Sequence, residues 1–197
     1  MKFAQSQLFN KPSLFLFWIF FGSTAMAQED HSRHALTDSR GFHLSLAVAH
    51  TYIPETTIDG KETIALPSLG LDIEYYFNHK LGLGLHNDLE LLVFELKKDQ
   101  GNVIRREFPV LLTMDFLYRL TPKFVVFVGP GVELETSENY AVFRLGAEYM
   151  AHISDKVSFS PILSYDFRSK AYDTFSIGVG VGLKLEKKKP LKLGKGT

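Results

Sequence analysis

Residues 175–183 read Phe-Ser-Ile-Gly-Val-Gly-Val-Gly-Leu, so that large apolar residues alternate with serine or glycine. A period of two is the signature of a β-strand, because successive side chains of a strand point to opposite faces of the sheet. One face of this strand is therefore apolar and bulky, whereas the other face has almost no side-chain volume. The pattern predicts a strand in a sheet with one apolar face and one crowded face.

Seven earlier segments alternate in the same way, which makes eight predicted strands. They cover residues 42–49, 69–77, 81–91, 107–119, 124–134, 143–153 and 157–167. Tight turns are expected at 78–80, 121–123 and 154–156, and longer loops at 53–65, 97–102, 135–139 and 168–173. An even number of strands with short turns at one end and longer loops at the other predicts an all-β fold, an eight-stranded antiparallel up-and-down barrel over residues 41–185.

The two faces of the strands favour a transmembrane barrel. Nine glycines share the parity of the polar residues, at positions 70, 82, 84, 129, 131, 146, 178, 180 and 182. The lumen of an eight-stranded barrel is only just wide enough for side chains, whereas a solvated face has no need of glycine, which weakens strands. Lysine is also nearly confined to turns, loops and the tail, with only Lys184 near a strand end. The alternative is a soluble periplasmic lipocalin-like barrel, with the faces inverted, that binds a small apolar ligand.

Prolines interrupt three of the predicted strands. Pro109, Pro130 and Pro161 each lack the backbone N–H that a ladder hydrogen bond needs. Because proline in a sheet is usually confined to strand ends, edges and bulges, we expect local bulges at these positions.

The ends of the chain differ from the barrel in composition. Residues 1–27 combine Lys2 and Lys11 with a short apolar stretch and a small-residue pattern, which predicts a secretory signal peptide cleaved between Ala27 and Gln28. Its apolar stretch, residues 14–21, is too short for a spanning helix, which needs about 20 residues. We expect residues 28–40 to be a flexible polar lead-in and residues 186–197 a basic tail.

Charge and cysteine content exclude some classes of function. The chain has 197 residues, with 22 lysines and arginines against 22 aspartates and glutamates, so its formal net charge is zero. A nucleic-acid-binding domain usually carries a basic stripe, so we expect no nucleic-acid partner. The absence of cysteine excludes a disulfide framework and thiolate chemistry.

Two strands carry a resemblance to a known group. The stretches Phe127-Val-Gly-Pro-Gly-Val-Glu133 and Gly178-Val-Gly-Val-Gly-Leu183, with the strand rhythm over 41–185, resemble small bacterial outer-membrane barrels of the OmpA transmembrane-domain and OmpX type. The resemblance implies a monomer in the outer membrane of a Gram-negative bacterium, with periplasmic termini. Its implied partners are outer-membrane lipid and the barrel-assembly machinery. Roles in this group range from structure and adhesion to lipid hydrolysis, so the fold does not choose among them.

The polar face of the strands holds charges that we expect to pair inside the lumen. Symmetric pairing about the turns places Arg144 opposite Asp166, with Glu133 as its partner on the other side, and Asp72 opposite His86. The remaining members of the predicted interior ion-pair network are Asp88, Glu90, Asp115, Arg119 and Glu148. Charges in a narrow interior are costly unless paired, so we expect a closed lumen, filled by Phe94, Leu111, Phe127, Met150 and Ile162. A gate or narrow ion path is the alternative.

Other polar patterns point only weakly to chemistry. The run His86-x-Asp88-x-Glu90 places possible ligands on one strand face, but about 7 Å apart, so a metal site would need other strands. His43, Ser45 and His50 are close in sequence, yet Ser45 has lumen parity and no outward His–Ser pair appears, which disfavours a lipid-modifying enzyme. We therefore expect no metal, no cofactor and no enzymatic activity, and a structural or surface-interaction role.

Overall fold

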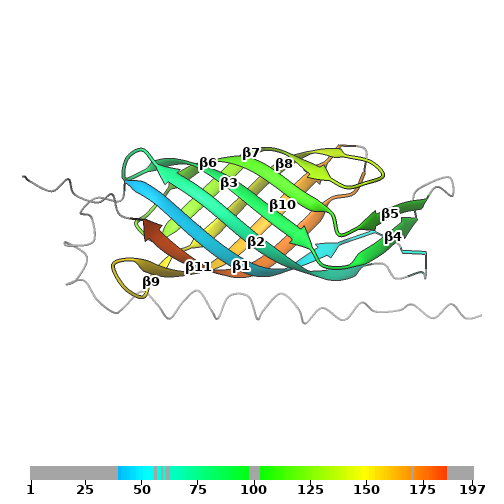
Figure 1. Cartoon of the computed structure of the whole chain (residues 1–197), viewed down its shortest axis with the longest axis horizontal. Coiled ribbons are helices and arrows are strands. Elements are labelled where there is room, and N and C mark those ends of the chain that lie inside the picture. Colours follow the sequence, from blue (N-terminus) through cyan, green and yellow to red (C-terminus); the bar gives the residue numbers. More distant parts are fainter. Residues whose placement is uncertain are drawn as a thin grey trace, which may run out of the picture. The chain divides into compact units, whose positions relative to one another are not determined.

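The computed structural model describes residues 40–55, 57–58, 60, 63–97, 103–169 and 171–185. Figure 1 shows these residues in colour. The predicted signal peptide with its cleavage point between Ala27 and Gln28, most of the polar lead-in and the basic tail lie outside the described residues.

The described chain forms strands connected by turns and loops. They are β1 (Gly41–Ile53), β2 (Ile64–Tyr76), β3 (Leu81–Glu90), β4 (Val93–Lys97), β5 (Val103–Glu107), β6 (Val110–Arg119), β7 (Phe124–Leu134), β8 (Tyr140–Tyr149), β9 (Ala151–His152), β10 (Val157–Arg168) and β11 (Thr174–Leu185). In this part of the chain, no helix is long and apolar enough to cross a membrane.

The main sheet closes on itself. Its order is β11-β1-β2-β3-β6-β7-β8-β10, each pair is antiparallel, and β11 also pairs with β10. The short strand β9 continues β8 along β10 in the same register. The predicted eight-stranded antiparallel up-and-down barrel is therefore confirmed, and it has no open sheet edge. We call the end with the turns at 78–80, 121–123 and 154–156 the turn end, and the opposite end the loop end (Figure 1).

The prolines interrupt hydrogen bonding without shifting the register. On both sides of Pro130 the β6–β7 partners keep one alignment, from Thr113↔Gly131 to Phe116↔Val128. Pro161 likewise stands in an unbroken β10–β11 ladder, opposite Val179. The expectation of bulges at these two sites is wrong, because a missing N–H removes one bond but inserts no extra residue. Pro109 lies before β6, next to Phe108, whose φ is 46°.

Large apolar side chains cover the outside of the barrel. Leu46, Val48, Leu71, Ile73, Leu85 and Met114 are exposed along the middle of the strands. Exposed aromatic rings follow near the turn end, at Phe42, Phe77, Tyr118, Phe124 and Tyr149. A second group faces outward near the loop end, at Tyr52, Phe143, Tyr165, Phe167 and Phe175. An apolar band between two aromatic girdles is the exterior of a membrane-spanning barrel, and the inverted, lipocalin-like arrangement is not present.

Glycine makes room inside the narrow lumen. A Cβ atom added to Gly146 would lie 2.3 Å from Cζ of Phe127, which packs inside the lumen toward the turn end. Phe127 belongs to a buried cluster with Tyr76, Leu117, Val125 and Met150, and Ile162 packs against it. The glycine parity seen in the sequence therefore marks the lumen-facing side of the strands.

The hairpin β4–β5 is a feature that the strand count did not predict. It forms a separate two-stranded sheet between β3 and β6 and extends beyond the barrel at the loop end (Figure 1). One face of the hairpin is buried in a cluster made of Ile53, Leu66, Phe94, Leu96, Tyr140 and Tyr172. We call this cluster the loop-end cap. Phe94 and Tyr172 meet edge to face, with ring centroids 5.7 Å apart.

Candidate functional site

The charged network in the lumen begins directly beneath the loop-end cap, at Glu133 of β7. The Glu133 side chain is 1% exposed and accepts hydrogen bonds from Arg106, at 2.6 Å, and from Tyr172, at 2.8 Å. It also accepts a hydrogen bond from Nε of Arg168. Two guanidinium groups on one carboxylate satisfy the need of a buried charge for opposite charge and for hydrogen bonds. Glu133 is therefore the common acceptor of three structural elements.

Arg106 connects the hairpin to the barrel. This residue of β5 is fully buried, and its guanidinium also donates to Glu135, at 3.1 Å, and to the carbonyl oxygen of Glu138, at 2.6 Å. Its guanidinium carbon lies 4.7 Å from the ring centroid of Tyr140. Arg106 thus binds the hairpin to the loop between β7 and β8 and closes the mouth of the lumen.

Two groups at this mouth lie outside the spanning strands and have shifted pKa values. Hydrogen bonds from Ser137 hold the pKa of the Glu135 carboxyl below its usual value. Burial raises the pKa of the Tyr172 hydroxyl above its usual range, so this group stays protonated and remains a donor to Glu133.

A second layer lies deeper and centres on Arg144 of β8. Arg144 donates to both carboxylate oxygens of Asp166, at 2.6 and 3.0 Å, and reaches Asp88 of β3 at 2.6 Å. Thr174 links the two layers, because its hydroxyl accepts from Arg168, at 2.7 Å, and donates to Asp166, at 3.3 Å. A chain of ion pairs and hydrogen bonds, joined through Thr174, therefore runs from the hairpin to the middle of the barrel.

A third layer surrounds His86, nearer the turn end. Nδ1 of His86 lies 2.9 Å from Asp115, and Nε2 lies 3.4 Å from Glu74. A Cβ atom on Gly84 would lie 2.6 Å from Nε2, so glycine at this position leaves room for the ring. Arg119 stacks on Tyr76, with its guanidinium carbon 3.5 Å from the ring centroid.

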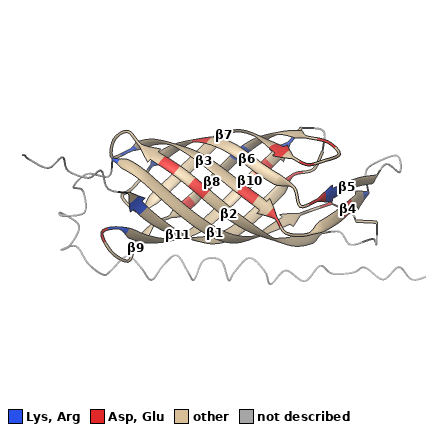
Figure 2. Cartoon of the chain, in the orientation of Figure 1, with Lys and Arg blue, Asp and Glu red and all other residues tan. Residues whose placement is uncertain are grey.

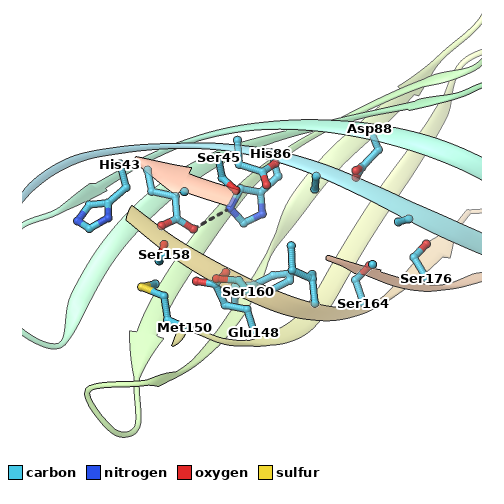
Figure 3. A pocket seen from close by; sticks show the side chains of 18 of the residues that line it. His43, Ser45, His86, Asp88, Glu148, Met150, Ser158, Ser160, Ser164 and Ser176 are labelled. Atoms are coloured by element: carbon cyan, nitrogen blue, oxygen red, sulfur yellow. Dashed lines mark hydrogen bonds and ion pairs between the residues drawn. The ribbon is translucent and has the colours of Figure 1, made fainter. Parts of the chain in front are cut away.

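A small cavity lies beside the second and third layers. Its volume is about 50 Å3, and its lining includes the charged residues Asp72, Glu74, His86, Asp88, Arg144 and Glu148. Small side chains from β1, β10 and β11 also line it, and Figure 3 labels Ser45, Ser158, Ser160, Ser164 and Ser176 among them. Because a buried water needs about 10–15 Å3 of such space, the cavity has room for a few water molecules.

The structure arranges the residues expected in the interior network differently from the sequence-based registers. Asp166 stands opposite Arg144 and pairs with it. Glu133, however, lies opposite Tyr140, whereas Gly129 lies opposite Arg144, so Glu133 does not pair with Arg144. The position expected for Glu133 is taken by Asp88, from the far side of the lumen.

The remaining expected members also face the lumen. Asp72 stands opposite His86 in the ladder, but the ion pairs of His86 are with Glu74 and Asp115. Glu90 is buried, with Oε1 3.7 Å from Arg168. Asp72 and Glu148 line the cavity.

Sequence reasoning missed Glu74, Glu135, Arg106, Arg168 and Tyr172 as members of the network. Arg106 and Arg168 fell at the edges of predicted loops, and Tyr172 fell inside one. The sequence does contain a signal that could have identified Arg106. Val93–Lys97 and Val103–Glu107 both alternate between apolar and polar residues and flank a short polar stretch, which is typical of a β-hairpin. Nothing in the local pattern of Tyr172 marked it as a lumen residue.

The two patterns considered for chemistry do not come together. Among the described residues, no group of three or more His, Asp or Glu side chains could hold a metal ion. His43 and Ser45 line the cavity, whereas His50 has the outward parity and is exposed. A hydroxyl in the lumen and an imidazole on the outer surface cannot form a nucleophile–base pair.

Comparisons with known proteins return the same architecture. No protein-family model and no curated protein matches the chain. Among solved structures it is similar to Ail, the attachment invasion locus protein of Yersinia pestis, with 12% identity, a TM-score of 0.49 and coverage of 74% of this chain and 99% of that one. Neisserial surface protein A shows 13% identity, a TM-score of 0.48 and coverage of 74% and 97%. OprG of Pseudomonas aeruginosa shows 15% identity, a TM-score of 0.43 and coverage of 74% and 97%. The expected resemblance to small outer-membrane barrels is confirmed for the fold.

Proposed function

We propose that this chain is a non-enzymatic outer-membrane protein with a closed lumen, whose role is structural or consists of contacts made by its loop end. The observation that carries the proposal is the closure of the lumen at two levels. The loop-end cap and Arg106 cover the mouth, and the cluster around Phe127 fills the region near the turn end. Between them, the cavity of about 50 Å3 has room for water but for no substrate of ordinary size.

The membrane location is supported by the exterior of the barrel. An apolar band between aromatic girdles suits a bilayer, and a closed barrel satisfies all its strand hydrogen bonds without water. In a bacterium with two membranes, barrels of this kind with a secretory signal belong in the outer membrane, with the turn end and both termini in the periplasm. We propose the same arrangement here.

The surface role is supported by the hairpin β4–β5. It extends beyond the strands of the main sheet at the loop end (Figure 1), and it carries the exposed residues Val93 and Val103. A hairpin that is attached by a buried arginine and a buried apolar cluster presents a defined surface at low entropic cost. We propose this hairpin as the part of the chain that meets a partner outside the membrane.

The first test is localisation and heat-modifiability of the whole chain. We expect it in the outer-membrane fraction of a Gram-negative host, and we expect unboiled protein to migrate differently from boiled protein on an SDS gel. Recovery as a soluble periplasmic protein without such a shift would contradict the proposal.

The second test concerns closure. In planar bilayers, we expect the purified protein to show no conductance steps above the baseline, and Arg144→Ala to lower the temperature of the heat shift without opening a path. Steady conductance that changes in Arg144→Ala would instead favour the alternative given in the sequence analysis, a gate or narrow ion path.

A further inference from the structure

The turn end of the barrel carries a ring of basic side chains. The third residue of each tight turn is a lysine, at Lys80, Lys123 and Lys156. Arg40 before β1 belongs to the same end and is exposed. Lys184 of β11 also lies at this end, but it stands opposite His43, which lines the cavity, so its side chain is on the lumen face. Figure 2 shows lysine and arginine in blue at this end, on the left. We call Lys80, Lys123, Lys156 and Arg40 the basic rim.

The opposite end of the barrel has the opposite character. In the described part of the chain, the three tight turns contain a single acidic residue, Asp155. The loops and hairpin of the loop end carry more carboxylates than basic groups. The carboxylates are Glu55, Glu95, Glu107, Glu135, Glu138 and Asp173, and the basic residues of the hairpin are Lys97, Arg105 and Arg106. The barrel is therefore polarised along its axis, although its total charge is close to balanced.

The depth of the basic rim is defined by its neighbours. Phe124, exposed on the outer surface, directly follows Lys123, and Phe77 precedes the turn that holds Lys80. Aromatic girdles lie at the level of the lipid headgroups, so the rim lies at or just beyond that level. A lysine placed there can lay its aliphatic stem along apolar surface and keep its ammonium group among the headgroups.

From this position we propose that the basic rim binds anionic phospholipid headgroups of the leaflet at the turn end. Each lysine ammonium donates to a lipid phosphate, and the spacing of the turns around the barrel distributes these contacts over a belt of surrounding lipids. This binding surface is additional to the closed lumen and to the hairpin. It gives the chain a preference for anionic lipid at one of its two ends.

A tryptophan reporter can test the rim directly. The only tryptophan of the chain is Trp18, so Trp18→Phe removes the background signal of any uncleaved protein. Phe124→Trp then places a reporter beside Lys123, and Phe167→Trp places a matched control on the outward face near the loop end. The full chain is inserted into phosphatidylcholine vesicles that contain either brominated phosphatidylglycerol or brominated phosphatidylcholine, whose bromines quench tryptophan on contact.

We expect the reporter at position 124 to be quenched more by brominated phosphatidylglycerol than its share of the lipid predicts. For one lysine–headgroup contact at low salt, the preference for the anionic lipid should be about fivefold. It should fall in about 0.5 M salt, because salt screens exposed charges. The reporter at position 167 should show no preference for the anionic lipid. Replacing Lys80, Lys123 and Lys156 together by glutamine should remove the preference at position 124, whereas replacing them by arginine should keep it.

Several outcomes would overturn the proposal. Equal quenching by the two lipids at position 124, or a preference that survives the triple glutamine replacement, would show that the rim does not select headgroups. Loss of the preference in inorganic phosphate, but not in sodium chloride of equal ionic strength, would identify a site for the free ion instead. The heat shift on SDS gels reports whether each variant is folded, and Lys123→Gln alone provides the same comparison if the triple variant fails to fold.

Discussion

Glu133 contacts three buried side chains that lie on different elements, and the sequence pattern of its own strand predicts none of these contacts. It accepts from Arg106 of the hairpin, from Arg168 of β10 and from Tyr172 of the last loop, while its own side chain is almost completely buried. Buried ion pairs are weak evidence of net stability, but removing one partner is costly, because the remaining charges stay buried without compensation. Glu133 therefore compensates the positive charges of two arginines that are buried in a low-dielectric interior.

Replacing Glu133 by alanine should lower the free energy of unfolding by about 3–5 kcal/mol, since two buried guanidinium groups lose their shared carboxylate. Urea titration of the protein in lipid vesicles measures this change. Glu107 is the matched control, because its half-exposed side chain pairs with Arg105 at the surface. Glu107→Ala should change stability by less than about 1 kcal/mol. Equal effects of the two replacements would contradict the assignment of Glu133 as the common acceptor.

The hairpin β4–β5 is attached to the barrel by side chains and by few backbone bonds. Its strands form their own sheet, and within the described chain an isolated bridge, Thr57↔Leu96, pairs the hairpin backbone with the loop after β1. Phe94, Leu96 and Arg106 therefore determine whether the hairpin lies over the lumen. An element of this kind can loosen locally while the barrel stays closed.

Replacing Phe94 by alanine should loosen the hairpin selectively, because truncating a buried phenylalanine costs about 3–5 kcal/mol where the site cannot collapse. Amide hydrogen exchange should speed up in β4 and β5 and stay slow in β2, β3 and β7. Val93, the neighbour of Phe94 on the outward side, is 45% exposed, so Val93→Ala should leave exchange unchanged. Faster exchange throughout the barrel in Phe94→Ala would show that the hairpin and the barrel unfold together.

The loop between β7 and β8 should make the attachment of the hairpin depend on pH. The pKa of Glu135 is lower in the folded protein than in the unfolded chain, mainly because Ser137 donates to its carboxylate, with a contribution from Arg106. A lowered carboxyl pKa contributes stability that is present above the unfolded pKa and is lost as the pH falls through the folded one. The difference in stability between the natural chain and Glu135→Gln should therefore be full at pH 7 and disappear in acid. A difference that is independent of pH would contradict an ionised Glu135.

The whole molecule presents apolar side chains to its surroundings and encloses charged side chains in its lumen, and the barrel closes at β1–β11. In water this arrangement would expose a continuous apolar belt, which soluble monomers avoid. In a bilayer the same belt is solvated by lipid, and the lumen charges are compensated internally. Stability of the entire barrel is therefore coupled to the presence of lipid.

Replacing Leu71 by arginine tests this coupling, because Leu71 is 42% exposed on the outer surface of β2. A charge facing lipid near the bilayer midplane costs about 2–4 kcal/mol, and one near the interface costs about 0–1 kcal/mol. Leu120→Arg, in a turn at the barrel end, is thus the matched control with a small effect. The folded fraction in phosphatidylcholine vesicles, measured by the heat shift, reports both. Similar losses in the two variants would contradict the membrane depth assigned to Leu71.

The strands and their faces could be predicted because their signal is local. Alternation of side chains along a strand is a property of a few consecutive residues, so the apolar face of 69–77 or 175–183 is visible without any partner strand. Glycine parity and the positions of lysine then distinguish a lumen from a solvated surface. The tight turns likewise fix the order of neighbouring strands, which is why Asp166 could be placed opposite Arg144.

The partners inside the lumen depend on contacts that no local pattern encodes. Asp88 reaches Arg144 across the lumen, and Arg106 reaches Glu133 only because the hairpin folds over the mouth. The first contact depends on the stagger of the closed strands, and the second depends on the packing of the hairpin, in which Phe94 meets Tyr172. Both join residues that are far apart in the chain. Sequence periodicity therefore determines which side chains face inward, whereas closure of the barrel determines which of them meet.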